Sequence, residues 1–228
     1  MSDTLWNPLW ETVYQSRPWG QYPGEDVIRF VATHFFNAPD RAGVRLLEAG
    51  CGSGANLWFM AREGFCAHGV DGSPTAVHLA RARLERECPD WAHIGGQVQV
   101  ADMACLPYAD ASFDAVLDVV AACYSPLEDA RKCYAELARV TRPGGKLFMR
   151  SFATGCWGEG TGTSVSPGMW DCSEGPLSGL GPTRFTARDQ IDALLDGWQV
   201  ERLERELRSQ ADGSQAIIHW VAHATRRP

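Results

Sequence analysis

Three glycines at alternate positions constrain this chain more than any other segment. Residues 46–54 read Leu46-Leu47-Glu48-Ala49-Gly50-Cys51-Gly52-Ser53-Gly54. A strand pattern precedes the glycines, and a helical pattern over residues 55–63 follows them, with Gly64 placed to end the helix. Glycines in such a turn adopt backbone angles that other residues avoid, and they let a ligand lie against the main chain. The sequence therefore predicts a strand–loop–helix unit whose loop holds a nucleotide-like molecule.

The glycines by themselves fit two classes of cofactor. Residues 50–55 also satisfy the G-x-G-x-x-G/A fingerprint, in which a helix N-terminus holds the pyrophosphate of a dinucleotide. Glu48 favours S-adenosylmethionine, because a carboxylate at this position repels a pyrophosphate and attracts ammonium and sulfonium charges. A second strand pattern ends at Asp71, whose carboxylate can accept both ribose hydroxyls of an adenosine and so serves either cofactor.

Further segments complete an ordered set of motifs. In chain order they are E-A-G-C-G-S-G at 48–54, V-D-G-S at 70–73, A-D-M at 101–103, L-P-Y-A-D-A-S-F-D-A-V at 106–116 and R-V-T-R-P-G-G-K-L-F at 139–148. This succession resembles the motif set of class I S-adenosylmethionine-dependent methyltransferases, in the branch of small enzymes with a free-standing catalytic domain. The resemblance is strong over residues 44–152 and loose elsewhere. It implies an enzyme that uses S-adenosyl-L-methionine and releases S-adenosyl-L-homocysteine.

The resemblance also implies roles for single positions. Gly50, Gly52 and the backbone around them would contact the methionine and ribose parts of the cofactor. Asp71 would accept the ribose hydroxyls, Asp102 would bind the adenine amino group, and Met103 would lie near the adenine ring. Asp118, at the end of the fourth strand, would face the methionine end or the acceptor. The cofactor-binding candidates are Tyr14, Glu48, Ala49, Gly50, Cys51, Gly52, Gly54, Asp71, Gly72, Ser73, Asp102, Met103 and Asp118.

The order of strand and helix patterns predicts an α/β fold with a doubly wound, mostly parallel sheet. Residues 198–207 and 215–224 form a hairpin pattern around Asp212-Gly213. The resemblance implies a Rossmann-like methyltransferase fold of seven strands that ends in this antiparallel hairpin. We expect a single methyltransferase domain over residues 1–228, with an aromatic cap at 1–24, a cofactor-binding core at 44–152, a lid or insertion at 153–184, and a C-terminal helix and hairpin at 185–228.

Local signals set three finer expectations. Residues 142–145 read as a turn before a strand at 146–150, and a helix is expected from Thr186 through Leu195, with Asp189 closing a capping box. Residues 152–182 are glycine-rich and show almost no periodicity, which predicts a long loop that packs as a lid.

The acceptor site is expected in the irregular segments. Residues 6–22 hold five aromatic side chains, which fit either a helix packed on the core or a cover that stabilises a sulfonium by cation–π attraction. The substrate-binding candidates are Trp10, Arg17, Trp19, Tyr22, Cys123, Arg150, Trp157 and Arg184. No catalytic base is assigned, because in-line methyl transfer depends mainly on positioning and no histidine is singled out.

The composition of the chain limits the kinds of molecule that it is expected to bind. The chain carries 28 acidic and 21 basic residues, for a net charge of −7, and has no long basic run, so we expect no nucleic acid partner. It shows no leader pattern or run of eighteen apolar residues, and its eight cysteines form no C-x-x-C pair. We therefore expect reduced thiols, no metal, no membrane association, a cytoplasmic location, and a monomer or homodimer.

These observations favour methyl transfer to a small molecule at oxygen, nitrogen or sulfur. Enzymes that methylate nucleic acid amino groups would show an Asn/Asp-Pro-Pro-Tyr/Phe segment after the fourth strand, and this chain has none there. Three alternatives stay open: a protein side-chain methyltransferase, a regulatory protein that binds S-adenosylmethionine without catalysis, and, with less support, an NAD-dependent oxidoreductase.

Overall fold

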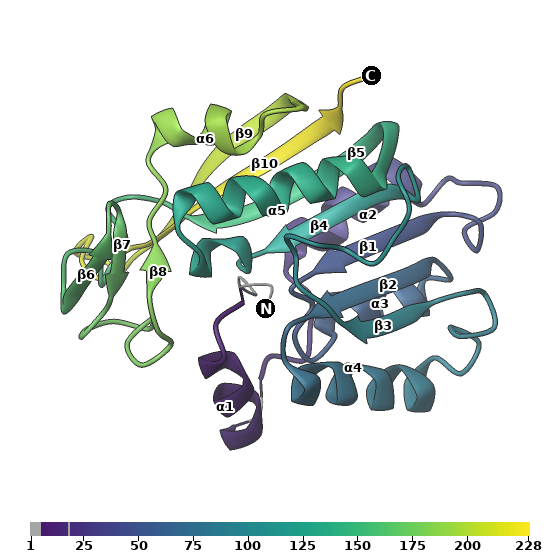
Figure 1. Ribbon diagram of the computed structural model, residues 1–228, viewed down its shortest axis with the longest axis horizontal. Helices are drawn as coiled ribbons and strands as arrows, with labels where there is room; N and C mark the ends of the chain where they lie inside the picture. The colour runs from purple at the N-terminus through teal and green to yellow at the C-terminus, as the bar shows by residue number, and fades with distance from the viewer. Residues whose placement is uncertain (1–5, 18) are drawn as a thin grey trace.

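A computed structural model describes residues 6–17 and 19–228. Its main sheet has seven strands in the order β3-β2-β1-β4-β5-β10-β9 (Figure 1). The strands are β1 (Arg45–Ala49), β2 (Cys66–Asp71), β3 (Gln97–Val100), β4 (Phe113–Val119), β5 (Thr141–Phe152), β9 (Trp198–Arg208) and β10 (Ile217–Arg226). β1 to β5 are parallel, and β10 runs antiparallel to both β5 and β9. The predicted fold class, with its C-terminal hairpin, is confirmed.

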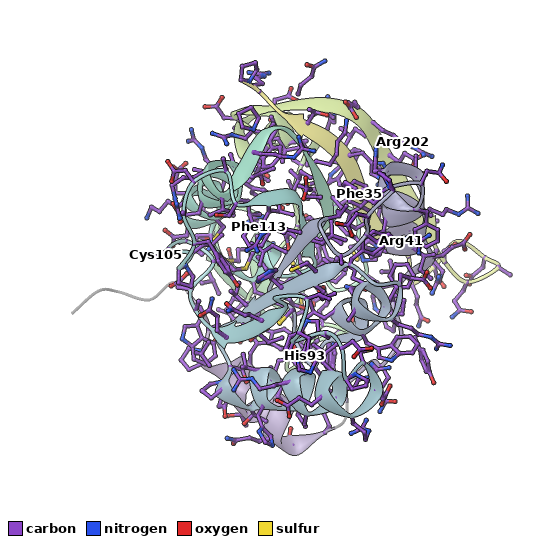
Figure 2. All side chains as sticks on the ribbon, turned by 90° about the vertical axis from the view of Figure 1, so that its right-hand side faces the viewer. Phe35, Arg41, His93, Cys105, Phe113 and Arg202 are labelled. Carbon is purple, nitrogen blue, oxygen red and sulfur yellow. The ribbon has the colours of Figure 1, made fainter. Side chains whose placement is uncertain are left out.

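Helices cover both faces of this sheet because successive side chains of a strand point to opposite faces. The helices are α1 (Leu9–Ser16), α2 (Glu25–Phe35), α3 (Ala55–Arg62), α4 (Pro74–Glu87), α5 (Leu127–Val140) and α6 (Arg188–Leu194), with a 3₁₀ turn η1 (Ala122–Tyr124). Leu47 packs in a buried cluster with α5 and α6, whereas Leu46 packs in another with α2, α3 and α4. Figure 2 labels one member of each cluster, Phe113 and Phe35.

The beginning of α6 differs from the sequence prediction. The helix starts at Arg188, and its capping contact is made by Gln190, whose side-chain oxygen accepts from the Ala187 amide at 3.0 Å. The prediction that Asp189 closes a capping box at Thr186 was therefore wrong. Thr186 is instead buried, and its carbonyl accepts from the Trp220 indole at 2.8 Å.

Residues 142–145 also differ, since they belong to β5, which begins at Thr141. The strand pairs with β4 from Phe113 onward, with an irregularity in register between Phe113 and Ala115. The glycine pair is accommodated by this irregularity within the sheet, so no separate turn precedes the strand.

Residues 152–182 are not the long loop that the sequence predicted. They contain β6 (Thr163–Ser166) and β7 (Met169–Asp171), which form a three-stranded antiparallel sheet with β8 (Thr183–Arg184). We missed these strands because they are short, bounded by glycine and, in β6, mostly exposed, so the sequence shows no clear alternation. Packing of the segment was expected, and it is observed.

This insertion shares a buried cluster with the N-terminal helix. Val13 of α1 packs with Cys156, Cys172, Leu177 and Leu180 of the insertion. Both segments lie on the side of the sheet where β4 ends (Figure 1). The two regions outside the strand–helix alternation therefore form one structure.

All eight cysteines are free thiols, seven buried and Cys105 exposed. Within residues 6–17 and 19–228, no group of three or more His, Cys, Asp or Glu side chains is arranged to hold a metal ion. No helix in the same described ranges has the length and apolar character needed to cross a membrane.

The third glycine of the loop gives a stability prediction. Gly54 has φ +83°, and a Cβ there would lie 2.9 Å from the Ala80 Cβ and 3.1 Å from its Cα. We expect Gly54→Ala to lower the free energy of unfolding by about 2–5 kcal/mol through backbone strain and overpacking. The control is Gly64→Ala, since Gly64 has φ +87° but open space around it, and we expect it to cost about 1–2 kcal/mol. Urea unfolding measures both, and equal losses would mean that contact with α4 is unimportant.

Candidate active site

A cavity of about 290 Å³ opens at the carboxyl ends of β1 and β4. The strand order reverses between these two strands, and ligands of open α/β sheets bind at such switch points. The side chains and backbone around the cavity come from the N-terminal segment, the glycine loop, the end of β2, the segment after β3, and the segment after β4. They are Trp6, Asn7, Trp10, Tyr14, Trp19, Gly20, Tyr22, Gly24, Glu48, Gly50, Cys51, Gly52, Ser53, Ala55, Asn56, Asp71, Gly72, Ala101, Asp102, Met103, Val119, Val120, Ala121, Tyr124, Ser125 and Cys133.

Asp71 fastens the glycine loop to the end of β2. One carboxylate oxygen accepts from the Gly52 amide at 2.9 Å, and the other accepts from the Ser73 amide at 2.9 Å. The side chain is only 8 % exposed, and burial raises its pKa while these backbone bonds lower it. Each carboxylate oxygen retains a lone pair after one bond. Asp71 can therefore accept two further hydrogen bonds from a ligand that enters the cavity.

The first two glycines of the loop are needed for close approach. Gly50 has φ +72° and faces the Ala121 side chain, and Gly52 has φ +52° with the Tyr14 hydroxyl 2.5 Å from where its Cβ would lie. Gly72 is covered in the same way by the indole ring of Trp6. The N-terminal segment thus lies directly on the backbone that was predicted to hold the cofactor.

Glu48 is a buried carboxylate that reaches the cavity. It is 2 % exposed, and one oxygen accepts from the Asn56 side-chain amide at 2.5 Å. The other oxygen has no hydrogen-bond partner within the described part of the chain. Burial raises the pKa of Glu48 to about 8, the Asn56 bond opposes the shift, and the nearby Asp71 and Asp118 add to it. A cationic ligand group would supply the missing partner.

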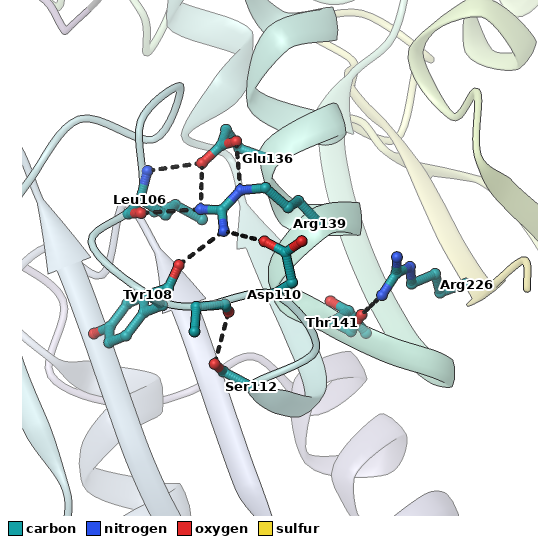
Figure 3. A network of polar contacts seen from close by, with 9 residues as sticks. Leu106, Tyr108, Asp110, Ser112, Glu136, Arg139, Thr141 and Arg226 are labelled. Carbon is teal, nitrogen blue, oxygen red and sulfur yellow. Dashed lines mark hydrogen bonds and ion pairs between the residues drawn. The ribbon is translucent and has the colours of Figure 1, made fainter.

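The segment after β3 supplies Asp102 and Met103, as predicted. Both line the cavity, and the Asp102 carboxylate accepts from the Ala104 amide at 2.9 Å. The motif at 106–116 anchors this segment to α5, because Arg139 donates to the carbonyls of Leu106 at 3.0 Å and Tyr108 at 2.8 Å (Figure 3). The motif at 106–116 therefore holds the loop after β3 in place.

Asp118 does not face the cavity, so the expected contact with the methionine end or the acceptor is corrected. The carboxylate is fully buried and accepts from the amides of Ala121 at 2.9 Å and Ala122 at 3.2 Å. It also accepts from the Tyr134 hydroxyl at 2.5 Å. These bonds position η1, which carries lining residues at its end.

Three other cofactor candidates do not line the cavity. Gly54 packs on α4, and the Ser73 hydroxyl accepts from the Ala76 amide at 3.0 Å to cap that helix. Ala49 is buried in the core on the face that α5 covers. The remaining candidates, Tyr14, Glu48, Gly50, Cys51, Gly52, Asp71, Gly72, Asp102 and Met103, are brought together as expected.

Among the substrate candidates, the three N-terminal aromatics Trp10, Trp19 and Tyr22 line the cavity. The ring centroid of Trp10 lies 5.4 Å from that of Trp19, 5.9 Å from that of Tyr14, and 4.6 Å from that of Tyr124. Aromatic residues from the beginning of the chain and from the end of η1 thus form one cluster at the cavity.

The other five substrate candidates lie elsewhere. Arg17 is exposed over the Trp19 ring, at 5.2 Å from its centroid, and Cys123 is a buried residue within η1. Arg150 forms an ion pair with Asp26 at 2.5 Å and does not line the cavity. Trp157 packs within the insertion, on Gly175. None of these four residues lines the cavity, although their positions in the sequence suggested that they would bind the substrate.

Arg184 does not line the cavity either, but it holds the turn after β4 that forms part of the cavity wall. Its guanidinium is fully buried and donates to the carbonyls of Ala122 at 3.2 Å and Ser125 at 2.5 Å. The insertion therefore reaches from β8 to the segment that follows β4, where it fixes the turn beside the cavity.

The sequence interpretation missed several lining residues after β4. Tyr124 and Ser125 follow the end of a central strand, which is the place where open α/β sheets bind ligands, so this signal was available. Val120 gave no signal, but it has φ +59°, a left-handed conformation that a β-branched side chain rarely adopts. Such strain concentrates at functional sites. Asn56 was missed because only the folded loop brings it to Glu48.

The buried Glu48 predicts a pH dependence of stability. Its folded pKa of about 8 lies above the ordinary value of 4.5. Between these values the folded state holds a proton that the unfolded state releases, so this group's contribution to the free energy of unfolding falls as pH rises, by at most about 1.4 kcal/mol per unit. Glu48→Gln keeps an oxygen for Asn56 and removes the titration. We expect the variant to gain stability over the unaltered chain between pH 5 and 8, in urea unfolding at each pH.

The control for this measurement is Glu85→Gln, because Glu85 is exposed on α4. We expect its difference from the unaltered chain to stay constant with pH. A constant difference for Glu48→Gln as well would contradict the assigned burial of the charge.

Comparison with known proteins agrees with this geometry. Residues 47–149 match the family model described as a methyltransferase domain. The chain is 34 % identical over 112 residues to a demethylmenaquinone methyltransferase of Tropheryma whipplei, covering 49 % of this chain and 43 % of the relative. It is 36 % identical over 115 residues to a malonyl-[acyl-carrier protein] O-methyltransferase of Hahella chejuensis, covering 48 % and 37 %. The chain spans less than half the length of these curated relatives.

Solved structures share the fold over more of the chain. A structure that concerns the conversion of a disulfide bond into a thioacetal group during echinomycin biosynthesis has a TM-score of 0.70 at 21 % identity, covering 96 % of this chain and 91 % of that one. A SAM-dependent methyltransferase of Methanosarcina mazei has a TM-score of 0.67 at 20 % identity, covering 80 % and 92 %. These findings identify residues 47–149 as a methyltransferase domain, and the chain shares its fold with S-adenosylmethionine-dependent methyltransferases.

Proposed function

We propose that this chain binds S-adenosylmethionine at the ends of β1 and β4 and transfers its methyl group to a small-molecule acceptor at oxygen, nitrogen or sulfur. The observation that carries the proposal is Asp71, a cavity-lining carboxylate held by the Gly52 and Ser73 amides beside the glycine loop. Methyltransferase-named relatives support the reaction type.

The described residues fit the cofactor by the chemistry of their donors and acceptors. Asp71 suits two ribose hydroxyls, and Glu48 has a buried oxygen without a partner that suits an ammonium or sulfonium charge. Asp102 and Met103 line the same cavity on the side of β3, where an adenine would be held. When bound, S-adenosylmethionine would supply an electrophilic methyl group on a sulfonium, with the neutral thioether S-adenosylhomocysteine as a good leaving group.

The chain's own contribution to the reaction is positioning. Three lining residues, Tyr14, Tyr124 and Cys133, stay protonated at neutral pH, because burial raises the pKa of the two tyrosines well above the ordinary range and raises that of Cys133 to about 12. No histidine of the described residues lines the cavity. Holding two reactants in line can supply about 7–11 kcal/mol without any proton transfer.

Two alternatives have some support. A regulator that binds S-adenosylmethionine without catalysis would also have no catalytic base. In addition, a structure named as the [4+2]-cyclase SpnF shares the fold, with a TM-score of 0.65 at 19 % identity, covering 97 % of this chain and 92 % of that one. Methylation of a protein side chain would need a more open site. An NAD-dependent oxidoreductase has less support, because β10 is antiparallel to β5 whereas the dinucleotide fold continues in parallel.

We further propose that residues 1–24 and 153–184 act as a cap and an insertion on one domain spanning 1–228. The support is their shared buried cluster and the aromatic residues that the first segment places on the cavity. Free, mostly buried thiols agree with a cytoplasmic location. A monomer or homodimer without nucleic acid or membrane partners remains our expectation.

Substitution of Asp71 tests the cofactor site. Asp71→Ala removes an ionised acceptor whose bonds are worth roughly 1.5–3 kcal/mol each, so we expect S-adenosylhomocysteine to bind about a hundredfold more weakly or worse. The matched control is Asp110→Ala, since Asp110 is exposed and pairs with Arg139 outside the cavity. Calorimetry with S-adenosylhomocysteine and with NAD measures binding, and circular dichroism checks the fold. Tight binding by folded Asp71→Ala, or preference for NAD, would overturn the assignment.

The activity itself is tested by transfer of a labelled methyl group from S-adenosylmethionine to fractionated metabolites. We expect a labelled small molecule from the unaltered chain and none from Asp71→Ala. Cofactor binding without any labelled product would favour the regulator.

A second prediction concerns the cap. Glu11 of α1 accepts from the Ser73 hydroxyl at 2.5 Å and from the Thr75 hydroxyl at 2.5 Å, which docks the helix on the start of α4. We expect Glu11→Ala to speed amide exchange over residues 9–16 about tenfold and to leave β1 and β4 unchanged. Gln15→Ala is the control, because among the described residues the Gln15 side chain donates a hydrogen bond to Glu11 and none to α4.

In the same experiment, S-adenosylhomocysteine should slow exchange in residues 6–22 and 152–182 together, since both segments pack in one cluster. Unchanged protection in both segments would show that they are fixed packing and do not close over the cofactor.

A further inference from the structure

We propose that the acceptor of this site is a flat, π-rich molecule that carries no negative charge, held in an aromatic slot formed by Trp10, Trp19, Tyr14 and Tyr124. This inference rests on the proposed function and names the substrate class of the same cavity. It is carried by two independent observations, the ring geometry of the slot and the charges of the cavity wall.

The slot combines two segments that are distant in sequence. Trp10 is its centre, with its ring centroid 4.6 Å from Tyr124 at an interplanar angle of 70° and 5.4 Å from Trp19 at 85°. Tyr14 completes it, 6.1 Å from Trp19. These edge-to-face contacts pack the four rings into one aromatic surface, and all four line the cavity, where a further aromatic ring can pack on them.

Aromatic side chains of the slot and next to it also leave surface open to solvent. Trp19 is 37 % exposed and Tyr22 is 75 % exposed, and both line the cavity. Apolar aromatic surface of this size beside a cavity is typical of a binding site.

The charges of the wall have one sign. The carboxyl groups of Asp71 and Asp102 line the cavity, as does that of Glu48, which its pKa of about 8 keeps protonated at neutral pH. No Lys, Arg or His lines the cavity within residues 6–17 and 19–228. Like charges repel most strongly where water is excluded. A carboxylate or phosphate on the acceptor would therefore be disfavoured, whereas a neutral or cationic group would be accepted.

Two guanidinium groups near the slot leave this balance in place. Arg17 lies over the Trp19 ring, 5.2 Å from its centroid, but it is exposed, so water screens its charge. Arg184 is fully buried, donates to the carbonyls of Ala122 and Ser125, and has the Asp118 carboxylate in its electrostatic environment. Neither one is a lining residue.

Three indoles of different charge test the proposal: tryptamine, indole and indole-3-acetate. They share one ring and differ in charge, and each is titrated calorimetrically into the chain saturated with S-adenosylhomocysteine. We expect tryptamine and indole to bind at least about tenfold more tightly than indole-3-acetate. We expect Trp10→Ala to weaken binding of tryptamine and indole, with little effect on S-adenosylhomocysteine.

Gly20 offers a matched pair of variants that separate local from overall charge. It lines the cavity beside Trp19, and a Cβ there would meet nothing within 4 Å, so a side chain is accommodated. Gly20→Lys adds an ammonium at the slot, and we expect it to reverse the preference toward indole-3-acetate. We expect Gly20→Ala to leave the order of the three indole affinities unchanged.

The outcomes distinguish this inference from the proposed function. Failure of S-adenosylhomocysteine to bind would refute the cofactor assignment. Binding of S-adenosylhomocysteine together with equal or tighter binding of indole-3-acetate, or with no binding of any indole, would overturn the slot alone. An unchanged order in Gly20→Lys would show that the preference reflects the net charge of the chain and would also overturn it.

Discussion

The site depends on the two hydrogen bonds that the Asp71 carboxylate accepts from the backbone of Gly52 and Ser73. They join the glycine loop after β1 to the end of β2 and leave each oxygen able to accept once more. The Gly50 and Cys51 amides reinforce the joint by donating to the Val70 carbonyl at 2.8 and 2.9 Å. The loop is thus shaped before any ligand arrives, and a preformed site loses little entropy on binding.

This arrangement places carboxyl groups where water is scarce. Glu48, Asp71 and Asp118 are all buried, and burial raises the pKa of each. Asp118 is satisfied by the Tyr134 hydroxyl and two amides, and Asp71 by two amides, so their burial is largely offset by hydrogen bonds. Glu48 retains an oxygen without a partner in the described residues. Glu48 is the least satisfied of the three and, like Asp71, it lines the cavity, which is the pattern expected of a group that binds a cation.

The parts of the chain outside the strand–helix alternation give the cavity its specific character. The N-terminal helix places Tyr14 on the glycine loop and Trp10 beside Tyr14 at the cavity, and the insertion supports η1 through the buried Arg184. Their common cluster around Val13 and Leu177 means that neither segment buries its apolar side chains alone. Changes in one segment should therefore be felt by the other, because cores are close-packed and transmit displacements.

The sequence by itself determined the sheet, the glycine loop, and the two carboxylates Asp71 and Asp102, because these depend on short-range patterns and on ordered motifs. It also indicated the C-terminal hairpin from its turn and flanking strands. Only the tertiary structure decided that Asp118 faces Tyr134 and that Arg150 pairs with Asp26, since long-range packing chooses the partner of a buried charge. The same holds for β6 to β8: only two residues separate β6 from β7, but these strands are short and β6 is mostly exposed, so they leave almost no local pattern. The aromatic slot likewise arises only when the fold brings residue 10 against residue 124.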